Sequence, residues 1–180
     1  MSVEKNFLLI FDEIQAGLFR TGKLASGSHS NITADVYTFS KGLGAGLVKI
    51  AATTINHKKY IEEFGFLHTS TFAEDDLSSA MALEVLNRLD NQETISESMK
   101  NADYLEFRLQ HTKEIYPEII KEIRGKGFML AIEFFDVLKD ISFEFKMISE
   151  SNMQGYLLSS CLLNHEDIRM SPSLSNSLTL

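Results

Sequence analysis

The chain is 180 residues long, with 44% hydrophobic and 23% charged residues, a balance that is usual for a globular protein. Its formal net charge of −8 argues against a nucleic-acid partner, because nucleic-acid-binding surfaces are normally basic. No apolar run approaches the roughly 20 residues that a membrane helix needs, and the first residues carry no signal-peptide pattern, so we expect a cytoplasmic protein without a membrane partner.

Two short apolar runs each end at an ionisable residue. Asn6–Phe11 is followed by Asp12, and Val36–Ser40 is followed by Lys41. Both runs are rich in Phe, Ile, Leu and Val and are followed by glycine, which predicts buried parallel strands. Because ligands of open α/β sheets bind beyond the carboxyl ends of the strands, we expect Asp12 and Lys41 to meet over one ligand.

The remainder of the first half predicts a loop, a glycine turn, a third strand and two helices. In chain order these are the loop Leu24–Ala34, the turn through Gly42, Gly44 and Gly46, the strand Lys49–Asn56, a short surface helix at 57–64 and the helix Ser78–Leu89. In the last of these helices, an apolar stripe at positions 80, 83, 86 and 89 is expected to face the core, with 82 and 85 beside it.

The second half predicts a mixture of helices and strands. In chain order these are the helix Ile95–Tyr116 with apolar positions at 99, 102, 105 and 109, the tight turn Arg124–Gly127, the strand Phe128–Phe135, the helix Phe143–Asn152, the strand Tyr156–Leu163 and the short strand Ile168–Met170. The single cysteine, Cys161, cannot form an internal disulfide, and its apolar surroundings in the sequence predict a buried, inert thiol.

A phosphate-loop pattern, G-x-x-x-x-G-K, occurs at Gly17–Lys23. The next residue is Leu24, so the hydroxyl that binds Mg²⁺ in such loops is missing, and an Asp-Glu pair precedes the pattern where it would repel phosphates. A turn followed by a surface lysine is the favoured interpretation, although a nucleotide binder stays open as a rival. The five histidines show no metal-binding spacing, and no metal site is assigned.

Lys41 and Asp12 each have an ordinary and a chemical interpretation. Lys41 could be a solvated surface lysine, but its place between a strand and three glycines also suits a nucleophile that attacks aldehydes. Asp12 could cap the following turn. Paired with such a lysine, it could instead hold the pyridine nitrogen of pyridoxal phosphate protonated.

Five segments resemble the motifs of class III aminotransferases. IFDEIQAGLFRTGK resembles that family's F-D-E-V-Q-x-G-x-G-R-T-G, and TFSKGLGAG resembles the S-K-x-L-G-G-G around its Schiff-base lysine. HTSTFAEDDLSSAMALEVL, IIKEIRGKGFMLAIEF and EDIRMSPSL are similar to three further motifs of the family, in the same order. The chain departs from the family at Glu74-Asp75-Asp76, where Gly-Asn-Pro is usual, and at Val48, where proline is usual.

The resemblance implies a site for pyridoxal 5'-phosphate. Lys41 would bind the cofactor covalently and later carry a proton. Asp12 would pair with the pyridine nitrogen, and Gln15 would lie near the ring's phenolic oxygen. Thr71, with Ser70 beside it, would contact the phosphate, in this family across a homodimer interface. Arg169 would take a substrate carboxylate, while Arg20 and Arg124 match motif positions that we expect to be structural.

The implied fold is α/β, a fold-type-I PLP-transferase with a partial large domain, whose sheet is mostly parallel, and a small α+β domain. We expect residues 1–94 to form the carboxyl-terminal part of the large PLP-binding domain and 95–180 to form the small domain, truncated; the family's amino-terminal half would precede position 1. The implied function is transfer of an amino group from an amino acid or amine to a 2-oxo acid. The alternative is a truncated or degenerate homologue without independent catalysis, acting as an interaction or partner-dependent module.

Overall fold

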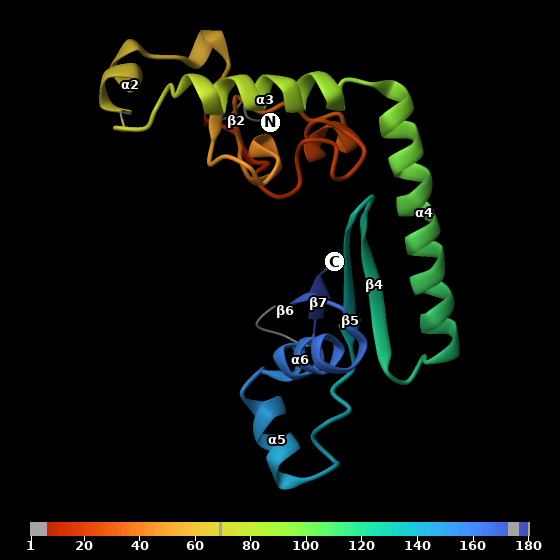
Figure 1. Cartoon of the computed structure of the whole chain (residues 1–180). Coiled ribbons are helices and arrows are strands. Elements are labelled where there is room, and N and C mark those ends of the chain that lie inside the picture. Colours follow the sequence, from red (N-terminus) through yellow and green to blue (C-terminus); the bar gives the residue numbers. More distant parts are fainter. Residues whose placement is uncertain (1–6, 69, 173–176, 180) are drawn as a thin grey trace. The chain divides into compact units, whose positions relative to one another are not determined.

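The computed structural model describes residues 7–68, 70–172 and 177–179, so Asn6, the predicted first residue of a strand, lies outside the described residues. The chain forms two compact units, Met1–Glu97 and Ser98–Leu180. The first contains β1 (Ile10–Asp12), β2 (Val36–Phe39), β3 (Ala52–Ile55), the 3₁₀ helices η1 (Ser26–Ser30), η2 (Lys41–Gly44) and η3 (His57–Lys59), and the helices α2 (Glu62–Leu67) and α3 (Asp76–Leu89) (Figure 1). The helix α4 (Gln92–Ile115) includes the division between the units, and β4 (Ile120–Lys126), β5 (Met129–Phe134), α5 (Phe143–Glu150), α6 (Gln154–Glu166), β6 (Ser171–Pro172) and β7 (Ser177–Thr179) follow.

The described strands of the first unit form one sheet in the order β1-β2-β3. β1 and β2 are parallel, with Ile10 opposite Val36 and Asp12 opposite Thr38. This confirms the predicted parallel pair, although β1 is shorter than expected and the predicted burial is wrong, because Ile10 is 57% exposed and the residues of β2 are only half-buried. β3 pairs with β2 in the antiparallel direction, a feature that its β-branched sequence did not predict. The carboxyl ends of β1 and β2 therefore lie side by side at one edge of the sheet.

Helix α3 buries the flank of the predicted stripe, where Ala82 and Val85 lie, and not its centre. It packs against η2. Ala82 is its buried residue, whereas Leu83 and Leu86 of the predicted stripe are 60% and 38% exposed. The segment is apolar on most of its circumference, so its periodicity did not determine which face would pack. The small side chain of Ala82 allows close approach to η2, where Leu43 and Gly44 are buried.

The described strands of the second unit form an antiparallel sheet in the order β4-β5-β7-β6. β4 and β5 form a hairpin in which Lys126 pairs with Met129, so Arg124–Lys126 belong to a strand and the predicted tight turn is wrong in its position. The buried cluster of this unit comprises Ile120, Ile123, Ile132, Met170 and Leu178, and Leu109, Leu158 and Leu162 from α4 and α6 pack against it. The helices thus cover the apolar face of the sheet.

Helix α4 confirms the predicted apolar stripe. Ala102 is 1% exposed, and Leu109, two turns later, packs against the cluster. The residues between them on other faces are largely exposed. This is the pattern expected of an amphipathic helix that covers one face of a sheet.

The predicted strand Tyr156–Leu163 is wrong, because these residues lie in helix α6. A short apolar run fits either a buried strand or a helix, and periodicity alone does not separate the two. Leu158 and Leu162, one helical turn apart, pack against the sheet, while Cys161 is exposed, contrary to the expectation of a buried thiol. Within the described residues, no helix is both long and apolar enough to span a membrane.

The last predicted strand is also displaced. Ile168–Met170 precedes β6, which begins at Ser171. Met170 nevertheless belongs to the buried cluster, and its carbonyl accepts a 2.8 Å hydrogen bond from the Ser159 hydroxyl of α6. The predicted strand is therefore wrong in its position, although Met170 is buried.

The opposite face of this sheet carries charges. The Glu133 carboxylate accepts hydrogen bonds from Lys121, at 2.6 Å, and from Arg124. Arg124 also donates to Glu122, at 3.2 Å, and to the Ser177 hydroxyl, at 3.2 Å. The hydrogen bond from Lys121, followed by that from Arg124, holds the pKa of Glu133 below its ordinary value. Arg124 therefore links three strands, in agreement with its expected structural role.

Replacing Leu130 by Ala should destabilise the second unit by about 2–5 kcal/mol, because Leu130 is 1% exposed and its removal leaves a cavity. Urea unfolding followed by circular dichroism measures the change. The matched control is Leu163→Ala in α6, where the side chain is 49% exposed and a change of less than about 0.5 kcal/mol is expected. Equal losses of unfolding free energy for the two substitutions would contradict the burial of Leu130 in the core.

Candidate active site

Asp12 ends β1 and projects at the edge where β1 and β2 both terminate. Its Oδ1 accepts hydrogen bonds from the Ile14 amide, at 3.1 Å, and from the Thr38 hydroxyl of β2, at 3.4 Å. The side chain is exposed, and among the described residues none donates to Oδ2. The neighbouring strand and the following turn thus orient one carboxylate oxygen and leave the other available to a ligand.

Lys41 follows β2 and opens η2 in an unusual backbone conformation. Its φ is +44°, in the left-handed region that residues other than glycine seldom adopt. Backbone strain of this kind costs roughly 1–3 kcal/mol and is concentrated at functional sites. Its amine donates a 3.0 Å hydrogen bond to Oε1 of Gln15, in the turn after β1. The strand ends are thereby joined through Gln15; no hydrogen bond or ion pair links Lys41 to Asp12 among the described residues.

The turn that carries Gln15 depends on Gly17. The Gly17 amide donates to the Glu13 carbonyl at 3.0 Å, which closes the turn. A Cβ atom at Gly17 would lie 2.7 Å from that carbonyl oxygen and 3.0 Å from the ring of Phe39. Glycine is therefore required where this turn lies against β2, and the position of Gln15 depends on it.

Glu13 is a residue of this region that the sequence analysis missed. It is 1% exposed, and its Oε1 accepts hydrogen bonds from the backbone amide and the hydroxyl of Ser26, each at 2.7 Å. Its own amide donates to the Thr38 carbonyl at 2.9 Å. Because side chains alternate along a strand, an exposed Asp12 implies an inward Glu13, and that alternation was the signal available in the sequence.

The phosphate-loop pattern forms a closed loop. The amides of Leu18 and Phe19 donate to the carbonyls of Leu24 and Lys23, at 2.9 and 3.1 Å, and the Gly22 amide donates to Phe19 at 2.9 Å. A phosphate loop needs such amides free to point at the anion. The geometry therefore agrees with the interpretation of this segment as a turn followed by a surface lysine.

Ser70 and Thr71 lie in an exposed turn before α3. The Ser70 hydroxyl accepts a hydrogen bond from the Phe72 amide at 3.3 Å, and no hydrogen bond joins either residue to Lys41 or Asp12 within the described part of the chain. The structure thus does not connect these two predicted phosphate contacts to the strand ends.

The acidic run that departs from the family pattern has a structural role. Asp75 is the N-cap of α3, where its Oδ2 accepts a 2.8 Å hydrogen bond from the Ser78 amide. The hydrogen bonds from Ser78 hold the pKa of Asp75 below its ordinary value. Asp76 follows in the first turn, where the helix dipole favours a negative charge.

Arg169 belongs to the second unit, and its side chain is exposed in the segment between α6 and β6. Its expected role as a carboxylate ligand stays a prediction. Among the described residues no three His, Cys, Asp or Glu side chains lie together in a group that could hold a metal ion.

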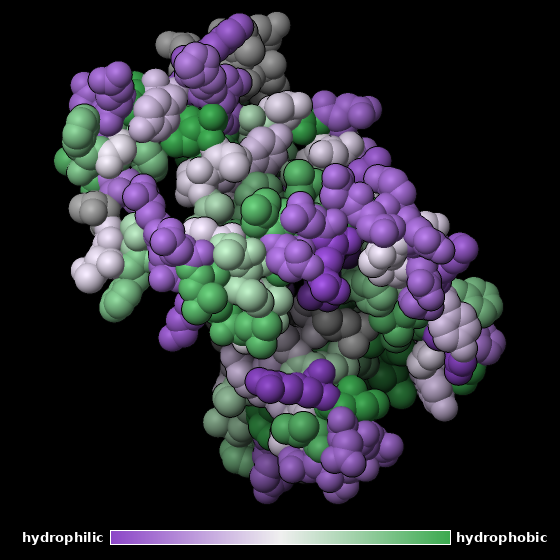
Figure 2. Space-filling view, turned by 45° about the horizontal axis from the view of Figure 1, so that its top comes forward, coloured by the Kyte–Doolittle hydropathy of each residue, from purple (hydrophilic) through white to green (hydrophobic). Residues whose placement is uncertain are grey.

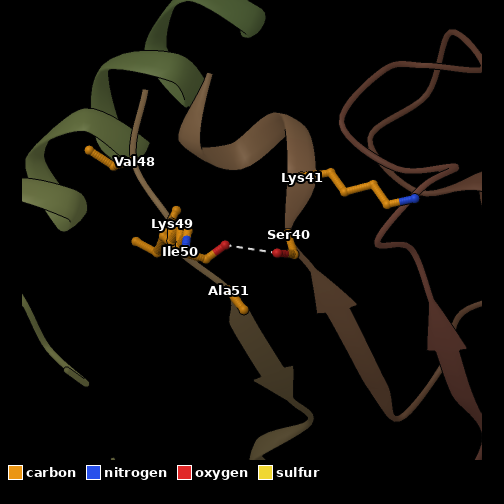
Figure 3. A pocket seen from close by; sticks show the side chains of 6 residues that line it. All are labelled: Ser40, Lys41, Val48, Lys49, Ile50 and Ala51. Carbon is orange, nitrogen blue, oxygen red and sulfur yellow. Dashed lines mark hydrogen bonds between the residues drawn. The ribbon is translucent and has the colours of Figure 1, made fainter. Parts of the chain in front are cut away.

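A shallow pocket of about 450 Å³ lies beside the strand ends and is lined by Ser40, Lys41, Val48, Lys49, Ile50 and Ala51. Figure 3 shows the Ser40 hydroxyl directed at the Ile50 carbonyl, to which it donates at 2.9 Å. The Lys41 side chain extends the opposite way, away from Val48–Ala51 (Figure 3). The Lys41 amine therefore lies on the side of Gln15, although Lys41 is among the residues that line the pocket.

A family model described as "Aminotransferase class-III" matches residues 1–177. Among solved structures, the ornithine aminotransferase of Plasmodium yoelii is similar over 99% of this chain and 44% of its own, with 26% identity and a TM-score of 0.76. The ornithine aminotransferase of Toxoplasma gondii ME49 is similar over 99% of this chain and 39% of its own, with 27% identity and a TM-score of 0.77. The acetylornithine aminotransferase of Elizabethkingia anophelis is similar over 99% of this chain and 41% of its own, with 28% identity and a TM-score of 0.73. The chain thus spans less than half the length of these proteins.

Gly17→Ala should destabilise the first unit by about 1–3 kcal/mol, since the added methyl group must displace either the Glu13 carbonyl or Phe39. The free energy of unfolding, measured in urea, tests this. The control is Gly42→Ala, because among the described residues a Cβ there meets only Leu18, at an ordinary 3.6 Å. If Gly42→Ala destabilised the unit as much as Gly17→Ala does, the close approach of Gly17 to the Glu13 carbonyl and Phe39 would be contradicted.

Proposed function

The chain belongs to the class-III aminotransferase family, and from this premise we propose that it carries the lysine-bearing part of a pyridoxal-phosphate-dependent amino-transfer site. The observation that carries the proposal is the meeting of two parallel strand ends. Lys41 follows one strand, Asp12 ends the other, and Gln15 joins them through a 3.0 Å hydrogen bond to the lysine amine. This arrangement supports a ligand that needs an amine and a carboxylate at a fixed separation.

The residues present fit such a cofactor. An aldehyde requires an amine that is free to react, and Lys41 is exposed and hydrogen-bonded to a neutral amide instead of a carboxylate. A pyridine nitrogen requires a carboxylate, and Asp12 offers Oδ2. Bound pyridoxal phosphate supplies a conjugated ring that accepts the electron pair released at the substrate's α-carbon. A solved structure of the Toxoplasma gondii ornithine aminotransferase is described as showing partial occupancy of PLP at its active site.

We assign the following roles to the chain's own groups. The Lys41 amine would hold the cofactor and, when free of it, would carry a proton to and from the substrate's α-carbon. Asp12 keeps a negative charge at the ring nitrogen, and its bonds to Ile14 and Thr38 hold it in place. Gln15 positions the Lys41 amine and lies near the phenolic oxygen. Ser70 and Thr71 would hold the cofactor phosphate, in a homodimer that of the neighbouring subunit, and Arg169 would bind a substrate carboxylate.

The proposed substrates are an amino acid or amine as donor and a 2-oxo acid as acceptor. Ornithine and acetylornithine appear in the descriptions of the similar structures and are the donors to test first. Residues 1–94 would supply the cofactor-binding part and 95–180 the smaller domain.

The length of the chain, compared with that of the similar structures, favours a second candidate function. Because the chain covers only 39–44% of the ornithine and acetylornithine aminotransferases, its role could be that of a partner-dependent module without catalysis of its own. In that case it binds pyridoxal phosphate weakly when alone. The next two experiments separate the candidates.

Borohydride reduction in the presence of pyridoxal phosphate, followed by peptide mass mapping, should place the label on Lys41. Lys41→Ala should abolish this label, whereas Lys49→Ala should leave it unchanged, because Lys49 is on the pocket side of the turn. Label spread evenly over surface lysines, and unaffected by Lys41→Ala, would refute a dedicated site.

Asp12→Asn should weaken binding of pyridoxal phosphate by about tenfold or more, since a hydrogen bond to a charged group contributes about 1.5–3 kcal/mol. Equilibrium dialysis gives the dissociation constant. Asp140→Asn, an exposed substitution in the second unit, is the charge-matched control and should have no effect. If Asp12→Asn had the same dissociation constant as the wild type, Asp12 would not take part in binding pyridoxal phosphate.

A further inference from the structure

Glu13 carries a carboxylate to which the proposed reaction assigns no role. Among the described residues it is the only charged side chain that is buried, and its Oε2 accepts no hydrogen bond from them. Hydrophilic side chains, drawn in purple in Figure 2, cover much of the face shown there, as is usual for charged groups. Burial of a charge costs free energy, and an apolar side chain would fill the same space without that cost. A buried carboxylate at this position therefore calls for a role other than packing.

The backbone of Glu13 joins the end of β1 to two other segments. Its amide donates to the Thr38 carbonyl of β2 at 2.9 Å, and its carbonyl accepts from the Gly17 amide at 3.0 Å. The first bond continues the parallel pairing one residue beyond Asp12, and the second closes the turn formed by residues 13–17. The position of this turn on the sheet therefore depends on Glu13.

The side chain of Glu13 attaches the same point to a third segment. Its Oε1 accepts two 2.7 Å hydrogen bonds from Ser26 of η1, one from the backbone amide and one from the hydroxyl. Hydrogen bonds to an ionised group are roughly twice as strong as those between neutral groups. Strand β2, the turn and η1 are thus all bonded to this one residue.

The turn that begins at Glu13 orients two groups of the proposed site. The Ile14 amide donates to Oδ1 of Asp12 at 3.1 Å, and Oε1 of Gln15 accepts from the Lys41 amine at 3.0 Å. Both bonds depend on the backbone direction with which the chain leaves β1. A rotation of the backbone at Glu13 would displace both donor and acceptor from their partners.

We propose that Glu13 is a positioning residue of the amino-transfer site, in which its buried carboxylate binds η1 and so fixes the turn that presents Gln15 to Lys41. The inference rests on the proposed function for the use of these groups, whereas the contacts that carry it belong to the chain without cofactor. Glu13 is buried and Asp12 is exposed, as the alternation of side chains along a strand requires, so Glu13 acts through the turn and not on a ligand.

Two substitutions separate this role from packing. Gln and Met both have nearly the length of Glu, so both fill the space. Glu13→Gln keeps an oxygen that can accept the two bonds from Ser26, whereas Glu13→Met offers only a weakly accepting sulfur. If Glu13 served packing alone, the two variants would leave the turn in the same state.

The first measurement is amide hydrogen exchange in the chain without cofactor. The Gly17 amide should exchange about tenfold faster or more in Glu13→Met, because the bonds that hold the turn to η1 are lost, and at about the wild-type rate in Glu13→Gln. Ser28→Ala, an exposed substitution in the same 3₁₀ helix, is the matched control and should leave the rate unchanged. Exchange of the β3 amides, which pair with β2, reports folding of the same unit in every sample.

The second measurement follows the side-chain amide of Gln15 by nuclear magnetic resonance, because packing alone would not change its contact with Lys41. In the wild type and in Glu13→Gln, adding Lys41→Ala should shift this signal, since the 3.0 Å bond is lost. In Glu13→Met the signal should already be shifted, and adding Lys41→Ala should change it no further.

If Glu13→Met exposes the β3 amides to exchange, Ser26→Ala replaces it. This substitution removes one of the two donors and keeps the carboxylate and its bond to the Ser26 amide, so it should speed exchange of the Gly17 amide by about threefold or more. The inference is overturned if the folded Glu13→Met or Ser26→Ala chain exchanges the Gly17 amide at the wild-type rate, or if Glu13→Gln exchanges it as fast as Glu13→Met.

An equal shift of the Gln15 signal by Lys41→Ala in the wild type and in Glu13→Met would also overturn the inference. None of these readouts uses pyridoxal phosphate. Failure of the borohydride labelling of Lys41 would therefore refute the proposed function, while the exchange of the Gly17 amide and the Gln15 signal decide the role of Glu13 separately.

Discussion

The parallel pairing of β1 with β2 is the constraint on which the candidate site depends. It places Asp12 opposite Thr38, and the ladder is continued beyond Asp12 by the hydrogen bond from the Glu13 amide to Thr38. Only parallel strands bring two carboxyl ends to one edge of a sheet, and with them the turn containing Gln15 and the turn containing Lys41. An antiparallel pair would place the lysine at the far end of the strand from the acid.

The turns beyond the strands adopt conformations that the local sequence alone does not favour. Lys41, Leu18 and Phe19 all have positive φ values, and Gly17 leaves no room for a side chain. Such conformations persist only where surrounding contacts determine them. Here the contacts are the hydrogen bonds of Glu13 to Ser26, those that close the loop from Leu18 to Leu24, and the contact of Gly17 with Phe39. The buried carboxylate of Glu13 thereby supports the site without belonging to its exposed surface.

The sequence predicted those features that depend on a local signal. The composition of the two apolar runs and the glycines after them indicated parallel strands, and the regular spacing in α4 indicated its buried face. Where several conformations share one signal, prediction failed. The run at 156–163 is apolar enough for a strand, but its helical form lets Leu158 and Leu162 pack on the sheet, a preference that only the tertiary structure provides. In α3, Ala82 is buried and Leu83 is exposed because η2 approaches the helix closely at Ala82. Arg124 lies in a strand because the hairpin turn is formed by Gly127 and Phe128 and not by Arg124–Gly127.

The hydrogen-bond partners of Lys41 and Asp12 support the proposed ligand, which has both an electrophilic carbon and a basic nitrogen. If Lys41 and Asp12 formed an ion pair, a ligand that reacted with the amine would have to break that pair and leave a carboxylate uncompensated. Instead the amine bonds to a neutral amide and the carboxylate bonds to a backbone amide and a hydroxyl. Reaction of the Lys41 amine then breaks no salt bridge of the described residues, and the Asp12 carboxylate stays available to the proposed ring nitrogen. Gln15 accepts the hydrogen bond of the amine in place of a carboxylate, which leaves both Lys41 and Asp12 to the proposed pyridine aldehyde.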